Sequence, residues 1–250
     1  MTVKRWVKAV ALLLISIVSG KAQLWIGNDN FNSANLDTSK WTVWGGPNFV
    51  KTTNSVSFVS TTSSGTVGDG IYWNQSLPTN ANWSVTVEAS ISPAFSTAGS
   101  TSFVEALLTI ASDVTNLNSY FTNCLHRDNT FDIVPNWSAN NSANQEILTT
   151  IGLSSVILKM DYNSSSKNIT SSYADFAAPS NFIITKSLDV SNWLNMSGGF
   201  KVLIGGYSQD SSISSGLLNL DNFVVIPEPS ALSLLAVGLG GLAMIRRRRS

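Results

Sequence analysis

The sequence predicts an all-β fold, an antiparallel β-sandwich or jelly roll, that lies between two terminal segments of different character. Two observations lead to this prediction. Apolar residues in the central region alternate with Ser, Thr and Asn over short runs, as in half-buried strands, and do not recur at helical spacing. Clusters of Ser, Asn, Asp and Gly separate these runs, as in domains built from short strands and tight turns.

The N-terminal segment, residues 1–22, is predicted to be a signal peptide. Basic, apolar and small residues follow one another there: Lys4, Arg5 and Lys8, then AVALLLISIV, then Gly20 and Ala22. This order is typical of a secretory signal peptide, and cleavage after Ala22 satisfies its preference for small residues. A structural helix is the alternative interpretation, but the extreme N-terminal position behind basic residues favours the signal peptide.

The body, residues 23–226, contains five runs rich in β-branched and aromatic residues, which are predicted to be strands: 55–60, 83–90, 154–162, 200–207 and 217–225. One stretch, SLDVSNWL at 187–194, predicts at most a turn or two of helix. An Asp-Asn-Phe pattern occurs at 28–32 and again at 220–225. We therefore expect the first and last strands to lie side by side.

Charge is distributed unevenly along the chain. The whole sequence has 15 basic and 15 acidic residues. Eight of the basic residues lie in the terminal segments, which leaves the body with seven lysines and arginines against fourteen acids, a formal charge of minus seven. An acidic body gives no electrostatic reason to bind nucleic acid or anionic lipid.

Cysteine usage excludes an intramolecular disulfide, because Cys124 is the only cysteine. About 200 residues are ample for a chain that depends on its core alone. We expect Cys124 to be a buried small apolar residue, the usual environment of a free cysteine. A reactive thiol or a link between two chains is the alternative.

Several motifs of the body resemble concanavalin A-like jelly rolls, the legume-lectin and laminin-G type sandwiches. The resemblance lies in LKMDYNSSSKNITSSY (158–173), in SLDVSNWLNMSGGFKVLIGGYSQDSSISSG (187–216) and in the opening DNFNSANLDTSKWTVWGG (29–46). Together these cover about half of the body. The resemblance implies a fold and does not imply an activity.

The C-terminal segment, residues 227–250, resembles a PEP-CTERM protein-sorting signal. Pro227, Glu228 and Pro229 precede Ser230, an apolar run at 231–245, and four arginines, Arg246, Arg247, Arg248 and Arg249. The resemblance implies a bacterial export substrate that an exosortase processes, often in organisms that make exopolysaccharide. A plain C-terminal membrane anchor is the alternative.

Physical chemistry accounts for the parts of this tail. A helix over 231–245 would be about 23 Å long, short of a hydrocarbon core of about 30 Å. Long arginine side chains can reach the membrane interface and so make up part of the missing length. Four arginines at the C-terminal end also keep that end on the cytoplasmic side, which leaves the body outside the cytoplasm. Prolines keep 226–229 extended and readable by a processing enzyme. The sequence thus predicts a precursor anchored in the inner membrane, and then a protein of the cell surface or extracellular matrix.

Carboxylate chemistry of the glycosidase type has no signature in the sequence. Jelly-roll glycoside hydrolases need two carboxylates across the scissile bond. No two acids are separated by one residue, and Glu88, Glu105 and Glu146 each stand alone. We expect no catalytic residues, although an acid pair assembled from distant strands remains an alternative.

Nucleophilic and metal chemistry find similarly little support. His126, the only histidine, lies two residues from Cys124, so the two would share one face of a strand, but no oxyanion motif surrounds them. One His and one Cys also exclude the usual zinc site. Legume lectins bind Ca²⁺ and Mn²⁺ through clustered side chains, and Glu105, Asp113 and Asn116 lack that spacing.

A structural Ca²⁺ site is possible near the first strand, and no other cofactor is expected. Asp29, Asn30 and Asp37 supply oxygen atoms of the kind that Ca²⁺ prefers. Asx turns explain the same three residues.

Aromatic residues are the best candidates for ligand binding, because a flat ring at a strand end can stack on a sugar. The candidates are Trp44, Tyr72, Trp73, Trp137 and Tyr207. Trp41, Trp83 and Trp193 are expected in the core. The preferred interpretation is a non-enzymatic exported protein that binds or accompanies extracellular polysaccharide. A glycan-degrading enzyme on the same scaffold is the alternative.

Overall fold

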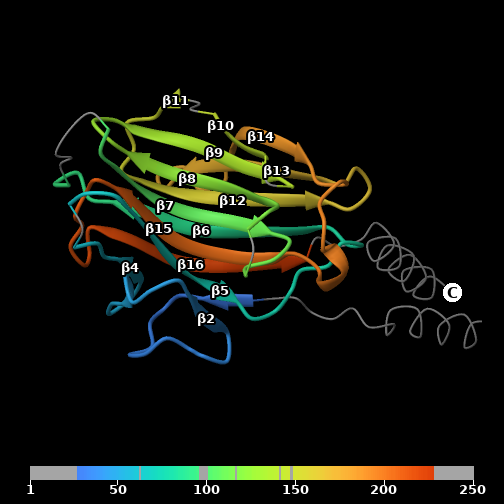
Figure 1. The fold of residues 1–250 in the computed structure, drawn as a ribbon, viewed down its shortest axis with the longest axis horizontal. Coiled ribbons are helices and arrows are strands. Elements are labelled where there is room, and N and C mark those ends of the chain that lie inside the picture. Colours follow the sequence, from blue (N-terminus) through green and yellow to red (C-terminus); the bar gives the residue numbers. More distant parts are fainter. Residues whose placement is uncertain are drawn as a thin grey trace, which may run out of the picture.

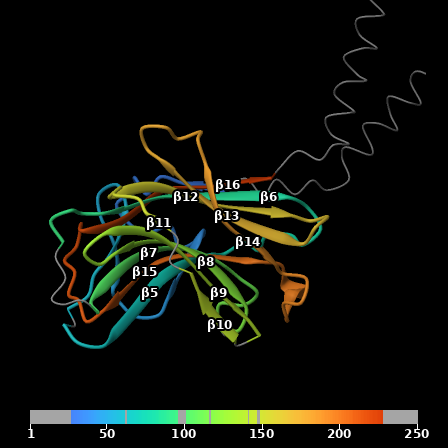
Figure 2. The same cartoon turned by 90° about the horizontal axis from the view of Figure 1, so that it is seen from above.

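Two antiparallel sheets pack face to face in the computed structural model, which describes residues 27–61, 63–95, 101–115, 117–140, 142–146 and 149–227. Figures 1 and 2 show the two layers from perpendicular directions. The predicted all-β sandwich is confirmed. The predicted signal peptide at 1–22 and transmembrane helix at 231–245 lie outside the described residues. Within the described ranges, no helix combines the length and apolar character needed to cross a membrane.

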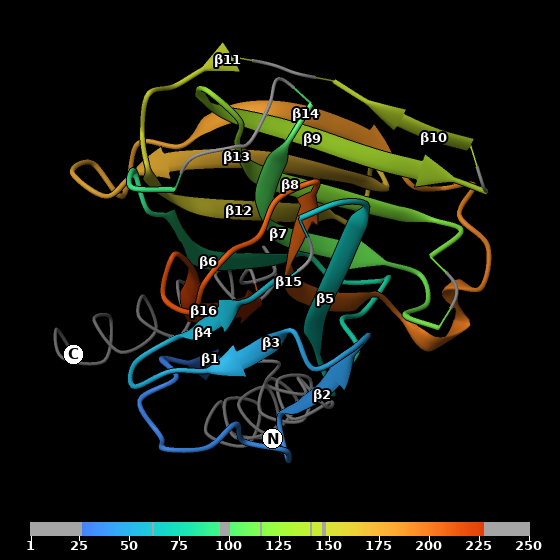
Figure 3. The ribbon, with the colours of Figure 1, turned by 60° about the vertical axis from the view of Figure 1, so that its left-hand side comes forward.

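One sheet, called the back sheet, has the spatial order β14 (Ile183–Asp189), β13 (Asn168–Asp175), β12 (Ser155–Asn163), β6 (Trp83–Ile91), β16 (Leu218–Pro227), β4 (Val56–Phe58) and β3 (Phe49–Lys51), with β1 (Gly27–Asp29) also paired to β16. The other, called the front sheet, has the order β10 (Ser142–Gln145), β9 (Phe131–Ala139), β8 (Tyr120–Arg127), β7 (Phe103–Ala111), β15 (Lys201–Gln209), β5 (Thr66–Trp73) and β2 (Trp41–Trp44), with β11 (Thr149–Thr150) paired to β9. Strands distant in sequence are thus neighbours in both sheets, as Figure 3 shows for β5, β15 and β7.

The five predicted strands are confirmed, since they correspond to β4, β6, β12, β15 and β16. The predicted neighbourhood of the two Asp-Asn-Phe segments is confirmed as well. Strand β1 pairs with β16, and Asp29 lies opposite Phe223. This pairing brings the N-terminal strand of the described chain against its C-terminal strand.

The prediction of a helical turn at 187–194 is wrong. Ser187, Leu188 and Asp189 belong to β14, where they pair with β13. The strand then ends in a turn, because the Asp189 carboxylate accepts a hydrogen bond from the Ser191 amide at 2.8 Å. The one helical element among the described residues is the short 3-10 turn Met196–Gly198.

The core between the sheets is rich in aromatic side chains. Trp41, Trp83 and Trp193 are buried, as predicted. Trp83 stacks on Tyr162 with ring centroids 5.2 Å apart, and Phe200 packs edge-on to both rings. Burying one large apolar side chain contributes about 1.5–3 kcal/mol, so this cluster is a major source of stability.

Close packing between the sheets leaves no room for a side chain at Gly206 in β15. A Cβ atom there would overlap the ring of Phe58, which reaches across from β4. Phe58 is itself fully buried, so its ring cannot move into solvent. Glycine is therefore required at this position by packing and not by its backbone angles.

We expect Gly206→Ala to lower the free energy of unfolding by about 1–3 kcal/mol, the usual cost of overpacking a core. The measurement is urea unfolding followed by tryptophan fluorescence. Gly198→Ala is the matched control, because a Cβ at Gly198 meets no atom within 4 Å. Equal stability of the two variants would contradict this account of the packing.

Candidate functional site

A cleft of about 470 Å³ lies on the outer face of the front sheet. Successive side chains of a strand point to opposite faces, so each strand contributes alternate residues to the core and to the cleft. The register places residues in rows across the strands. One row consists of Tyr207, Glu105, His126 and Asp132, on β15, β7, β8 and β9.

Glycines allow β5 and β15 to approach each other closely beside the cleft, and Gly68 lines it. A Cβ atom at Gly205 would lie 2.6 Å from the Asp69 carbonyl oxygen, and one at Gly68 would lie 3.0 Å from the Tyr207 ring. Bare backbone at these positions allows Tyr207 to lie against β5. The result is an open surface beside an aromatic ring.

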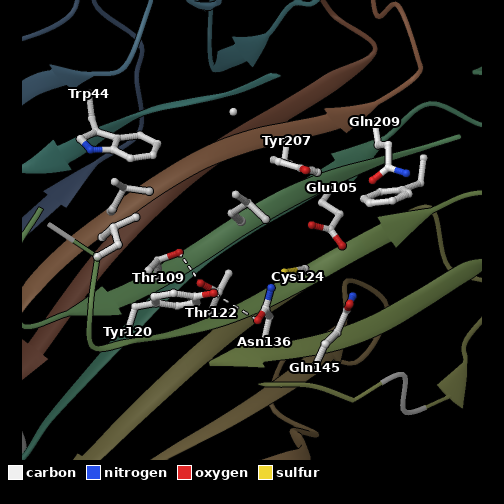
Figure 4. Close-up of a pocket in the computed structure, with 15 residues that line it drawn as sticks. Trp44, Glu105, Thr109, Tyr120, Thr122, Cys124, Asn136, Gln145, Tyr207 and Gln209 are labelled. Atoms are coloured by element: carbon white, nitrogen blue, oxygen red, sulfur yellow. Dashed lines mark hydrogen bonds between the residues drawn. The ribbon is translucent and has the colours of Figure 1, made fainter. Parts of the chain in front are cut away.

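Two of the five predicted aromatic candidates line this cleft. Trp44 lies toward one end of it, and Tyr207 lies near Glu105 and Gln209 (Figure 4). The Trp44 indole donates a hydrogen bond from Nε1 to the Val114 carbonyl oxygen at 2.8 Å, which fixes the orientation of its ring. Tyr207 stacks on Phe103, with centroids 5.8 Å apart and planes inclined by 29°.

Hydroxyl and amide groups make up most of the polar lining. Thr109 and Thr122 share a hydrogen bond between their hydroxyls at 2.8 Å, and the Tyr120 hydroxyl donates to Asn136 Oδ1 at 3.4 Å (Figure 4). Burial raises the pKa of Tyr120, which keeps its phenol a neutral donor. Among the described lining residues there is no lysine or arginine. The cleft is therefore suited to an uncharged, hydroxyl-rich ligand.

Glu105 is the only carboxylate among the described residues that line the cleft. It is 6% exposed, and its Oε1 lies 2.9 Å from Nδ1 of His126, which is 8% exposed. Cys124 and His126 share one face of β8, as predicted, because both point toward the cleft side. Cys124 is buried, as expected.

The other three aromatic candidates lie elsewhere. The prediction of a stacking role for Trp73 is wrong, because this side chain is 3% exposed and packs against Trp41 and Phe223 in the core. Trp137 is half-buried, and the Lys186 ammonium lies 4.6 Å from its ring centroid. Tyr72 is half-buried on β5 and does not line the cleft.

The candidate calcium residues already have partners. Asp29 accepts hydrogen bonds from the Phe31 amide at 2.8 Å and from the Trp41 indole at 2.9 Å. Asp37 accepts from the amide and hydroxyl of Ser39, which lowers its pKa despite the opposing effect of desolvation. Lys40 Nζ lies 3.9 Å from both carboxylates. This arrangement favours the Asx-turn interpretation, because a lysine supplies the positive charge that calcium would bring.

The remaining acids do not join Glu105. Glu88 lies on β6 of the back sheet and accepts a hydrogen bond from Asn222 at 2.9 Å. Glu146 pairs with Lys186 at 2.7 Å. Asp113 lies beyond the C-terminal end of β7, where it accepts hydrogen bonds from Thr115, and Asn116 is outside the described residues.

Comparison with protein families identifies the C-terminal segment. Residues 225–249 match the family described as PEP-CTERM protein-sorting motif. The chain carries a PEP-CTERM sorting motif. The motif indicates an exported protein with a membrane-anchored precursor that an exosortase processes. Pro227 of the PEP-CTERM motif is the last residue of β16, and the predicted motif residues Glu228, Pro229 and Arg246–Arg249 lie outside the described residues.

Solved structures identify the fold of the body that precedes the PEP-CTERM motif. Winged bean acidic lectin, complexed with methyl-α-D-galactose, has a TM-score of 0.53 and 9% identity, over 80% of this chain and 97% of the lectin. Xylan β-1,4-xylosidase from Bacillus halodurans C-125 has a TM-score of 0.55 and 13% identity, over 80% of this chain and 38% of the xylosidase. The predicted concanavalin A-like jelly roll is confirmed. No curated protein matches the chain by sequence.

Cys124 is expected to be unreactive in the folded protein. Burial raises the pKa of its thiol well above the ordinary value, and the nearby Glu105 carboxylate raises it further. Only the thiolate is a strong nucleophile, so Ellman's reagent should label the native protein at least 100-fold more slowly than the protein in guanidinium chloride. Rapid labelling of the native protein would contradict this burial.

Proposed function

We propose that this exported protein is a non-enzymatic glycan-binding protein of the cell surface or extracellular matrix, and that the cleft of the front sheet binds a neutral polysaccharide. The observation that carries the proposal is the composition of the cleft. Trp44 and Tyr207 offer aromatic surface, and threonine, asparagine and glutamine side chains offer hydrogen bonds without positive charge. Sugars present both apolar ring faces and hydroxyl groups, so this lining complements them.

The structural neighbours are compatible with the proposal. A lectin that is complexed with a galactoside and a xylosidase both have the fold of this chain. At identities of 9% and 13% these similarities concern the fold, so the argument for a glycan rests on the cleft itself. Export by the sorting motif would bring the cleft into contact with extracellular polysaccharide.

Glycan hydrolysis is the second candidate function. Glu105 favours it to a degree, because a buried carboxylate in a cleft is a common general acid. Retaining and inverting glycosidases, however, use two carboxylates that flank the bond. Glu105 has no second carboxylate among the described residues of the cleft lining, and it is already paired with His126. We therefore prefer binding without catalysis.

The test of glycan binding is affinity electrophoresis of the full chain, kept in detergent, through gels that contain soluble xylan, β-glucan or galactomannan. We expect retardation by at least one of these neutral polysaccharides. Tyr207→Ala should weaken binding about two- to tenfold, because an aromatic stack contributes about 0.5–1.5 kcal/mol. Tyr207→Phe keeps the ring and should bind like the unaltered chain.

Phe182→Ala is the matched control for this experiment. Phe182 is also a half-buried aromatic residue, but it packs against Lys159 of the back sheet, 4.8 Å from ring centroid to ammonium. Its removal should leave retardation unchanged. Absence of retardation by every polysaccharide would refute glycan binding. Release of reducing sugar that Glu105→Gln abolishes would instead establish the enzymatic alternative.

Processing of the C-terminal segment has a separate test. Glu228→Ala removes the acid between the two prolines of the motif, so we expect the unprocessed precursor to accumulate in the membrane of the producing cell. The measurement is immunoblotting of membrane and extracellular fractions. Asp210→Ala, in the turn after β15, changes an acid outside the motif and should be processed normally. Unchanged processing of Glu228→Ala would identify the tail as a plain anchor.

A further inference from the structure

Three ionisable side chains form a straight row at one end of the front sheet. The register places Glu105 opposite His126 and His126 opposite Asp132, on the adjacent strands β7, β8 and β9. All three are more than nine-tenths buried, with exposed fractions of 6%, 8% and 6%. The ring of Phe103 covers the imidazole, with centroids 4.8 Å apart. Buried charges of this kind normally have partners or bind metal ions.

The turn between β8 and β9 adds a fourth ionisable side chain. Asp128 accepts a hydrogen bond from the Thr130 amide at 2.7 Å, which holds its carboxylate beside the row. One potential ligand atom from each of His126, Asp128 and Asp132 lies within 4.8 Å of the other two.

The carboxylates of this group lack sufficient partners. Asp132 Oδ1 is buried and has no hydrogen-bond partner among the described residues. The Thr130 hydroxyl lies 3.0 Å from Asp128 Oδ1 and 2.8 Å from Asp132 Oδ2, and its single proton cannot serve both fully. The ion pairs among the described residues give Glu105, Asp128 and Asp132 no lysine or arginine. A cation would satisfy this excess of negative charge.

We propose that His126, Asp128 and Asp132 bind one divalent transition-metal ion of the Zn²⁺ class, and that Glu105 orients the imidazole for it. The ligand set decides the class of metal. An imidazole nitrogen with two carboxylate oxygens suits Zn²⁺ and its neighbours, whereas Ca²⁺ takes oxygen ligands almost alone. The set differs from the usual zinc site of histidines and cysteines, because carboxylates supply two of its three ligands.

The distances require only a small closure of the site. Zn²⁺ binds nitrogen and carboxylate oxygen at about 2.0–2.2 Å, so two ligand atoms of one ion lie at most about 4 Å apart. In the structure the ligand atoms of His126, Asp128 and Asp132 lie within 4.8 Å of one another, which exceeds this separation by less than 1 Å. Asp128 can supply the movement, because it lies in the turn and is the least buried of the three. Solvent would complete the coordination.

Glu105 acts in this site as a positioning residue. Its Oε1 lies 2.9 Å from Nδ1 of His126, so pairing with the carboxylate through Nδ1 would leave Nε2 as the nitrogen that binds the ion. Carboxylate–histidine–metal chains of this kind fix the tautomer and the ring orientation. The metal site is independent of the proposed function, because it needs no glycan and none of its three ligands, His126, Asp128 and Asp132, lines the cleft.

The experiment is equilibrium dialysis of the full chain in detergent, prepared without a histidine tag, against Zn²⁺ and separately against Ca²⁺. We expect one Zn²⁺ per chain with a dissociation constant in the micromolar range or below, and no Ca²⁺ binding at the same concentrations. Asp132→Asn and His126→Gln should each weaken Zn²⁺ binding at least tenfold. Glu105→Gln should weaken it about tenfold, the lower end of the effect of an orienting carboxylate.

Asp113→Asn is the matched control, because Asp113 makes the same pair of contacts with Thr115, both at 2.9 Å, as Asp128 makes with Thr130. It should leave Zn²⁺ binding unchanged. Visible absorption of bound Co²⁺ provides a second readout, and its loss in His126→Gln would identify the imidazole as a ligand. Circular dichroism of the metal-free variants checks that each is folded. The proposal is overturned if Zn²⁺ does not bind, or if folded Asp132→Asn binds it as tightly as Asp113→Asn.

Discussion

The cross-strand register of β15, β7, β8 and β9 is the constraint on which the rest of the front sheet depends. Because side chains alternate along each strand, one register sends Ile204, Leu108 and Leu125 into the core and Tyr207 and Glu105 into the cleft. A slip of one residue in any of these strands would turn cleft residues toward the core and expose apolar core residues, and in β7 it would bury the Glu105 carboxylate between the sheets. Burial of the core therefore also positions the cleft and the row that crosses it.

Four of the five strands predicted from the sequence, β4, β6, β12 and β16, belong to the back sheet, whereas β7, β8 and β9 of the front sheet were not predicted. Strand β12 shows the alternation of a strand with one buried face, and its residues alternate between buried and half-buried. In β8, the six residues from Phe121 to His126 are all buried, because the core covers one face and the cleft the other. A strand buried on both faces lacks the alternation of apolar and polar residues from which strands are recognised. For this reason no strand was predicted among the five runs within residues 103–139.

The candidate aromatics show what sequence can decide and what it cannot. Tyr72 and Trp73 are adjacent on β5, so their rings must point to opposite faces, and at most one of them could belong to an exposed platform. That argument was available from the sequence alone. Tertiary packing decides which of the two rings points into the core. That ring is Trp73, which completes the cluster around Trp41 and Phe223. The Glu105–His126 contact joins strands whose register the sequence does not specify.

The sorting motif and the sandwich share residues, which constrains how the tail can be processed. The family match begins at residue 225, inside β16, where Val225 is buried in the core. Ile226 and Pro227 still pair with β6, opposite Ser84 and Trp83. A cut before Pro227 would remove the end of this ladder beside a fully buried tryptophan, whereas a cut after it leaves the pairing complete. The folded body therefore includes Pro227, the first residue of the Pro-Glu-Pro triplet, so the last strand of the sandwich and the sorting motif overlap.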